Sequence, residues 1–82
     1  MDTKIEKNID KIRNTLETKG KVEFVIYSLN YIIEKVDNKY IIYSKNDSNR
    51  KQTYYNIDLL FKNYTIYNEN LKENDNKILY IK

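Results

Sequence analysis

The sequence predicts an α+β fold, in which an N-terminal helix and a short second helix pack on one face of a small antiparallel β-meander. Three observations support this prediction: a helical apolar stripe near the start, a change to period-two patterning, and a second helical segment with its own cap. With 82 residues, the chain is expected to form a single domain. The first helix is expected in residues 1–20, the meander in 21–55, and the short helix with one or two strands in 56–82.

The first helix is predicted by four aliphatic residues that share one face at spacings of four, three and four. Thr3 and Glu6 fit a capping box at its start, and Gly20 stands where a left-handed C-terminal cap is favoured. Arg13 and Glu17 are one turn apart and are expected to form an ion pair on the exposed face. The aliphatic stripe that should face the sheet consists of Ile5, Ile9, Ile12 and Leu16.

The meander is predicted by three runs of β-branched and aromatic residues at 21–27, 31–36 and 40–44. Turns are expected at 28–30 and at 37–39, where Asp and Asn tolerate a positive φ. With the first turn centred on residue 29, the expected register places Glu23 opposite Lys35 and Glu34 opposite Phe24. Because this puts Glu34 on the core face, either the register slips by one residue or Glu34 lies at an edge.

The rest of the chain alternates between polar connections and short apolar elements. Residues 45–50 are entirely polar and are predicted to form a loop, after which 52–55 returns as a fourth strand. Asn56 is expected to cap a helix over 57–63. Further extended segments are expected at 64–67 and 78–81.

The predicted strands are apolar on both sides, although the two helices suffice to cover only one face of the sheet. The second face is therefore a candidate protein-contact surface, because tyrosine meets both water and a partner well. A solvated sheet decorated with tyrosine is the alternative interpretation. The residues assigned to this second face are Val25, Tyr27, Tyr31, Ile33, Ile41 and Tyr43.

The missing residue types exclude several classes of chemistry. The chain has no Cys and no His, so it offers no thiol nucleophile, imidazole base or zinc site, and no catalytic residue, cofactor or metal is assigned. One glycine is too few for a phosphate-binding loop. Without a long apolar run or an apolar signal core, we expect a cytoplasmic protein that does not enter a membrane.

More than half of the residues are Lys, Asn, Ile or Tyr, whose codons are rich in A and T. An AT-rich genome therefore accounts for much of the net charge of +3 and for the nine tyrosines. Nucleic-acid binding remains the alternative function, because one segment gathers three cations next to two tyrosines. The residues of this candidate nucleic-acid site are Lys45, Arg50, Lys51, Tyr54 and Tyr55.

The leading functional hypothesis is a non-enzymatic protein-interaction module from an AT-rich bacterium or phage. A small domain without catalytic residues acts by covering the surface of a protein partner, as a host-directed or anti-defence inhibitor would. Self-association into a homodimer through the tyrosine-rich face is the other form of this hypothesis.

Overall fold

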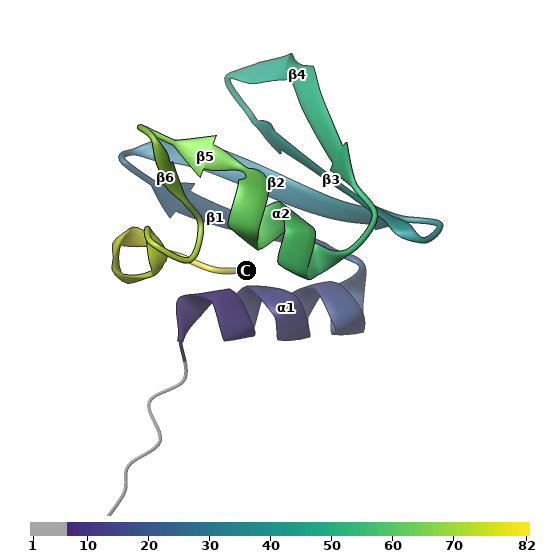
Figure 1. The fold of residues 1–82 in the computed structure, drawn as a ribbon. Helices are drawn as coiled ribbons and strands as arrows, with labels where there is room; N and C mark the ends of the chain where they lie inside the picture. The colour runs from purple at the N-terminus through teal and green to yellow at the C-terminus, as the bar shows by residue number, and fades with distance from the viewer. Residues whose placement is uncertain (1–6) are drawn as a thin grey trace, which may run out of the picture.

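The computed structural model describes residues 7–82, which form two helices, a four-stranded sheet and a small hairpin (Figure 1). Strands β1 to β4 pair antiparallel in chain order, which confirms the predicted meander. Strands β5 and β6 form a separate two-stranded hairpin, followed by a single 3₁₀ turn, η1. The elements are α1 Asn8–Lys19, β1 Lys21–Ile26, β2 Leu29–Val36, β3 Lys39–Ser44, β4 Asp47–Tyr54, α2 Ile57–Asn63, β5 Thr65–Ile66, β6 Glu69–Asn70 and η1 Asp75–Lys77.

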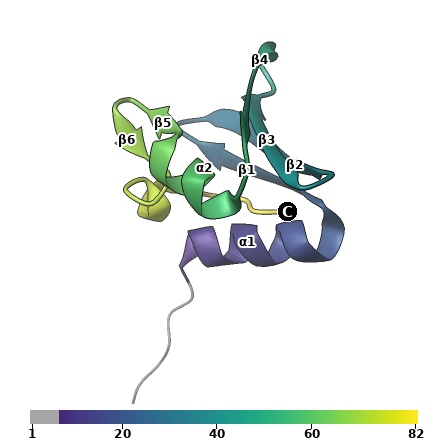
Figure 2. The same cartoon turned by 45° about the vertical axis from the view of Figure 1, so that its right-hand side comes forward.

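Both helices lie on the same side of the meander, as the two views show (Figure 1, Figure 2). The predicted α+β fold class is therefore confirmed. The core lies between the helices and this face of the sheet, and it holds Phe24, Ile33, Ile42, Leu60 and Phe61 without exposed surface. We call this side of the sheet the core face and the uncovered side the outer face.

Helix α1 follows the sequence prediction in its packing and at its end. Ile9, Ile12 and Leu16 are buried, and Gly20 adopts a left-handed φ of 75° while its N–H donates to the Leu16 carbonyl. Ile5 and the predicted capping pair Thr3–Glu6 lie outside the described residues.

A distant residue instead caps the start of α1. The Asp75 carboxylate accepts a hydrogen bond of 2.9 Å from the Ile9 N–H. The Asn8 side chain donates to the main-chain carbonyls of Asp75 and Ile78. Since the first N–H groups of a helix lack partners within it, these contacts both satisfy α1 and fix η1 against it.

The first turn of the meander differs from the sequence prediction. The loop consists of Tyr27 and Ser28 alone, with φ of 53° and 65°, as in a type I′ turn. This shorter turn moves the register by an odd number of residues, which exchanges the two faces of β2. Phe24 consequently pairs with Tyr31 rather than with Glu34, and Tyr31 belongs to the core face.

The same register changes the expected acidic contacts. Glu23 pairs across the strands with Ile32 rather than Lys35, and Glu34 with Lys21, so both carboxylates lie on the outer face. The predicted Arg13–Glu17 pair is also wrong. Arg13 instead bonds Asp10 at 3.3 Å and Asp58 of α2 at 2.6 Å, linking the two helices.

The predicted polar loop at 45–50 is largely a strand. Only Lys45 and Asn46 form the turn, and β4 begins at Asp47. The strand is exposed along nearly all its length, so it carries no apolar pattern that could announce it. The pairing register between β3 and β4 shifts in the middle: Ser44 pairs with Asp47, but Ile42 pairs with Gln52. Residues 48–51 of β4 therefore face the single residue Tyr43 of β3, and this part of β4 bends away from the sheet (Figure 2).

Helix α2 confirms the predicted cap, because the Asn56 side chain accepts a 2.8 Å hydrogen bond from the Leu59 N–H. After η1, the segment 79–82 returns to the free edge of β1. Leu79 pairs with Val25, and Lys82 bonds with Glu23, through reciprocal backbone hydrogen bonds. No helix among residues 7–82 is long and apolar enough to cross a membrane.

Candidate functional site

The tyrosine-rich face predicted from the sequence does not exist as one surface. Tyr31 and Ile33 lie in the core, with exposed fractions of 5% and 0%, because the shorter first turn exchanged the faces of β2. Tyr27 belongs to the turn itself. Only Val25, Ile41 and Tyr43 of the predicted set remain on the outer face.

The outer face is covered by its own charged side chains. Ile32 lies at its centre between Glu23 and Tyr43, yet only 4% of Ile32 is exposed. Lys45 forms an ion pair with Glu23, and its hydrogen bond lowers the pKa of that carboxyl. The Lys51 ammonium lies 4.8 Å from the centre of the Tyr43 ring. This face therefore presents a mixed, mostly polar surface rather than a bare apolar one.

Partial burial and the nearby Glu34 carboxylate both raise the pKa of Tyr43. Its hydroxyl therefore stays neutral, and a lysine lies over its ring. Tyr43 is therefore a partly exposed residue of the outer face that is neighboured by charged side chains.

The candidate nucleic-acid residues are divided between the two sides of the sheet. Lys45 and Lys51 contact outer-face partners, and Arg50 pairs with Asp47 at 3.3 Å. Tyr54 packs against the core instead, and its hydroxyl donates to the Gln52 side chain at 2.8 Å. Tyr55 is exposed beyond the end of β4, near Lys39. The three cations and two tyrosines therefore do not form a common surface.

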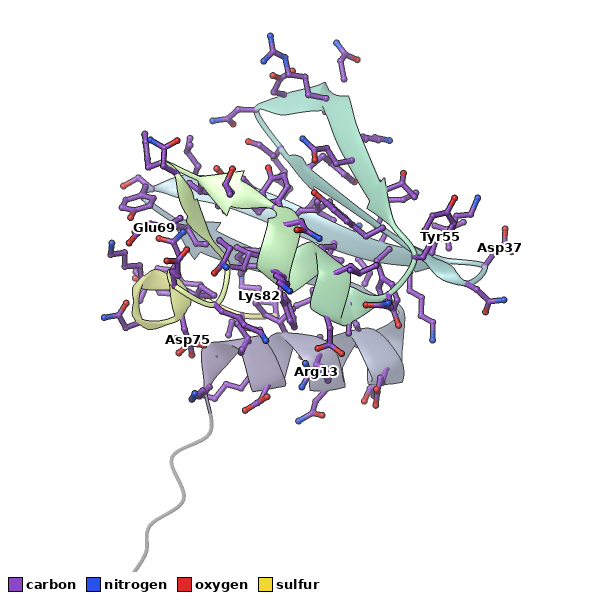
Figure 3. All side chains as sticks on the ribbon, in the orientation of Figure 1. Arg13, Asp37, Tyr55, Glu69, Asp75 and Lys82 are labelled. Atoms are coloured by element: carbon purple, nitrogen blue, oxygen red, sulfur yellow. The ribbon has the colours of Figure 1, made fainter. Side chains whose placement is uncertain are left out.

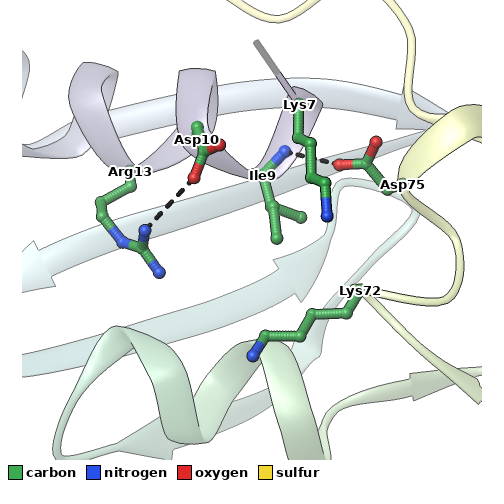
Figure 4. A pocket seen from close by; sticks show the side chains of 6 residues that line it. All are labelled: Lys7, Ile9, Asp10, Arg13, Lys72 and Asp75. Atoms are coloured by element: carbon green, nitrogen blue, oxygen red, sulfur yellow. Dashed lines mark hydrogen bonds and ion pairs between the residues drawn. The ribbon is translucent and has the colours of Figure 1, made fainter. Parts of the chain in front are cut away.

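A cavity of about 400 Å³ opens between the start of α1 and the segment before η1 (Figure 4). Three cationic side chains and two carboxylates line it together with Ile9. Asp75 caps the helix here, and Arg13 is held by Asp10, so these groups serve the fold. The residues that line the cavity are Lys7, Ile9, Asp10, Arg13, Lys72 and Asp75.

Two tyrosines from distant turns meet at one end of the molecule. The β5–β6 hairpin turns through Tyr67 and Asn68, whose φ values of 53° and 66° repeat those of Tyr27 and Ser28. The Tyr27 and Tyr67 rings pack edge to face with centroids 4.8 Å apart. Tyr67 is 71% exposed. We call Tyr27, Tyr67, Lys77 and Glu69 the tyrosine patch.

A buried asparagine anchors this patch. Asn74 has no exposed surface, and its amide donates to the carbonyls of Glu69 and Asn70, each at 3.1 Å. Its carbonyl oxygen accepts a 3.0 Å hydrogen bond from the Tyr27 hydroxyl. That hydroxyl also accepts a 2.9 Å bond from Lys77, which in turn pairs with Glu69. The Tyr27 side of the patch is thus rigidly held.

Tyr67 was missed from the sequence because its role depends on a contact between turns forty residues apart. Tyr27-Ser28 and Tyr67-Asn68 each follow an apolar strand residue and share the order of a tyrosine and a small polar residue. This order does not identify a turn, because Ile42-Tyr43-Ser44 has it as well and lies within β3. The sequence prediction placed Tyr27 and Tyr67 in extended segments instead.

Within residues 7–82, no group of three or more acidic side chains could hold a metal ion. The fold and surface define a small α+β domain with an antiparallel sheet. Comparisons with models of protein families, with curated proteins and with solved structures found no match to the chain.

Proposed function

We propose that the protein is a non-enzymatic interaction module that binds a protein partner through the tyrosine patch. One observation carries this proposal: Tyr67 exposes 71% of its surface from a left-handed backbone position, beside a second tyrosine held in the same conformation. A bulky residue at positive φ is uncommon and marks a turn, strain or a functional position; here the turn accounts for the φ value but not for the choice of tyrosine.

The energetics of Tyr67 argue against a purely structural role. A left-handed residue with a side chain costs about 1–2 kcal/mol relative to its usual conformation, and Asn or Gly relieves that cost. The edge-to-face contact with Tyr27 returns only about 0.5–1.5 kcal/mol. Because most of the Tyr67 ring lies in water, burial adds little, and the residue does not improve the fold over Asn.

The chemistry of the patch suits a protein partner. Tyrosine offers a large amphipathic surface with few rotatable bonds, which is why binding loops are rich in Tyr, Ser and Asn. Lys77 and Glu69 supply one charge of each sign at the margin. The patch therefore has no net charge that would attract a phosphate backbone, and its binding should depend weakly on salt.

Covering a partner's surface is the mode of action we propose. Its specific form is a host-directed or anti-defence inhibitor that comes from an AT-rich bacterium or phage, as composition and small size suggest. A homodimer through the same patch is the form in which the partner is a second copy.

The test compares immobilised wild-type protein with Tyr67→Asn and Tyr55→Asn in extracts of the source organism. Tyr55 is a matched control, because it is 76% exposed and lies at the opposite end of the molecule from Glu69 (Figure 3). We expect Tyr67→Asn to lower retention of the partner at least tenfold, and Tyr55→Asn to leave it unchanged. Light scattering on the same proteins detects self-association.

Equal retention by Tyr67→Asn and wild type would contradict the proposal. Retention that disappears after nuclease treatment, or in Lys45→Ala with Arg50→Ala and Lys51→Ala, would instead support the nucleic-acid function. Binding of a generic oligonucleotide at about 50 mM salt is the direct check, since electrostatic binding is strongest there.

A further inference from the structure

A second cavity lies on the core side of the sheet, where β4 bends away. Its volume is about 270 Å³, and its walls come from β2, β3, β4 and the connection between α2 and β5. The bend arises from the extra residues 48–51 of β4, which lift the strand off its neighbour. Unlike the cavity beside α1, this one is lined mainly by neutral hydroxyl and amide groups.

Tyr31 contributes a polar group to the wall of this cavity. The residue is 5% exposed, and its hydroxyl has no hydrogen-bond partner among residues 7–82. No buried side-chain oxygen or nitrogen of the described residues lacks a partner, so this hydroxyl must reach solvent. Tyr31 lines the cavity, and burial together with the neighbouring Tyr67 raises the pKa of its hydroxyl.

Tyr64 joins Tyr31 in the floor of the cavity. The two rings lie edge to face with centroids 6.3 Å apart, and Tyr31 also stacks on Phe24 at 5.9 Å. These contacts fix both rings in place. Burial, with the neighbouring tyrosines Tyr31 and Tyr54, raises the pKa of Tyr64 to about 12. Both hydroxyls consequently remain neutral and both donate and accept hydrogen bonds.

The remaining walls add neutral polar groups and one balanced ion pair. Ser44, Gln52 and Thr65 contribute two hydroxyls and an amide. The Ser44 oxygen already accepts the Asn46 N–H, and the Gln52 carbonyl oxygen accepts the Tyr54 hydroxyl, so the Ser44 O–H and the Gln52 amide N–H groups remain to donate. Arg50 and Asp47 also line the cavity, but they pair with each other at 3.3 Å. The site therefore has no net charge to attract an anion or a cation.

We propose that this cavity binds a neutral polyhydroxylated molecule about the size of one sugar ring. A water molecule takes about 30 Å³ in the liquid, so the cavity holds roughly nine waters, or a compact molecule of about a dozen heavy atoms. Neutral hydroxyls and an amide match the donors and acceptors of such a ligand, and the tyrosine rings meet its C–H surface. The ligand is either a free sugar or the terminal residue of a glycan.

The test is an NMR titration of the ¹⁵N-labelled protein with D-glucose, D-galactose, D-ribose and the corresponding methyl glycosides. At least one of them should cause saturable shifts in the amides of Tyr31, Ser44, Gln52 and Tyr64. A free sugar that binds without its methyl glycoside indicates a free ligand, and binding of both indicates the end of a glycan.

Two conservative variants make this assignment specific. Tyr31→Phe and Tyr64→Phe keep the rings and remove only the hydroxyls, so each should weaken binding about fivefold or more while the amide spectrum stays folded. Tyr43→Phe, on the outer face, is the matched control and should bind as the wild type does.

The inference is overturned if none of these sugars causes saturable shifts at up to about 100 mM, a concentration well above any useful dissociation constant. It is equally overturned if both Phe variants bind as tightly as wild type. Stronger shifts of the same amides with sodium phosphate or guanidinium chloride would assign the cavity to a charged ligand instead.

Discussion

The two ends of the meander use two-residue turns in different ways (Figure 3). At one end, the β2–β3 turn places Asp37 at a φ of 57°, and Asp is among the residues that most readily adopt this conformation. At the other end, the β1–β2 turn and the neighbouring β5–β6 turn place Tyr27 and Tyr67 at nearly the same φ. The turn geometry itself therefore does not require tyrosine.

The ends also differ in how they are supported. Asp37 and Tyr55 project into solvent, whereas the tyrosine end rests on the fully buried Asn74. Strained, exposed aromatic residues on a rigid support are what a binding surface needs, since little ordering is then left for the moment of binding. The comparison teaches that a two-residue turn serves connection at one end, where only Asp37 has a positive φ, and presentation of side chains at the other, where both turn residues do.

Among the substitutions that test the difference between the two ends, replacement of Asn74 should lower the free energy of unfolding most. Asn74→Ala removes the partner of the Tyr27 hydroxyl, the side-chain donor to the Glu69 and Asn70 carbonyls, and a fully buried side chain, so we expect the free energy of unfolding to fall by about 2–4 kcal/mol. Asn38→Ala in the opposite turn should change it by less than about 0.5 kcal/mol. Urea unfolding of both variants measures the difference. Similar losses in the two would show that the ends are equally supported.

Substitution of Tyr27 should have an intermediate effect on the free energy of unfolding. Tyr27→Phe keeps the ring contact with Tyr67 but removes the hydrogen bonds to Asn74 and Lys77. We expect a loss of about 1–2 kcal/mol in the free energy of unfolding, because a buried oxygen of Asn74 is left without its partner. Tyr55→Phe removes a hydroxyl in solvent and should cost nothing measurable. If Tyr27→Phe is as stable as the wild type, the hydrogen bonds of Tyr27 to Asn74 and Lys77 contribute little to the stability of the fold.

A smaller effect on stability is expected from Tyr64, which is partly buried against the core. Tyr64 keeps its proton in the folded state up to a pKa of about 12, whereas in the unfolded chain it ionises near 10. Between these values the folded state holds more protons, so stability falls as pH rises. The loss in stability from pH 9 to pH 11 should therefore be smaller for Tyr64→Phe than for wild type, as denaturant midpoints would show. Equal losses of stability in the wild type and in Tyr64→Phe would show that the Tyr64 hydroxyl is solvated in the folded protein.

The sequence was sufficient for elements that depend on local spacing. The buried residues of α1, its Gly20 cap and the Asn56 cap of α2 all follow from patterns within a few residues. It was insufficient for the β1–β2 turn, because tyrosine does not favour the left-handed conformation that Tyr27 adopts. That turn alone placed Tyr31 and Ile33 on the wrong face. The polar strand β4 and the capping of α1 by Asp75 depend on pairing with distant residues.

The candidate sites were harder to predict for the same reason. The tyrosine patch needs two turns that are distant in sequence to meet, and the cavity under β4 needs a bend in a strand without apolar residues. Neither leaves a periodic signal. The predicted outer-face residues could be assigned to a side of the sheet only after the register was known.

The most direct test of the central claim is the free energy of unfolding of Tyr67→Asn relative to wild type. If Tyr67 is present for binding, Asn should relieve the left-handed strain and offset the lost ring contact, leaving the protein as stable or more stable by up to about 1 kcal/mol. A loss of more than about 1.5 kcal/mol would contradict the account, because the ring would then support the fold rather than a partner.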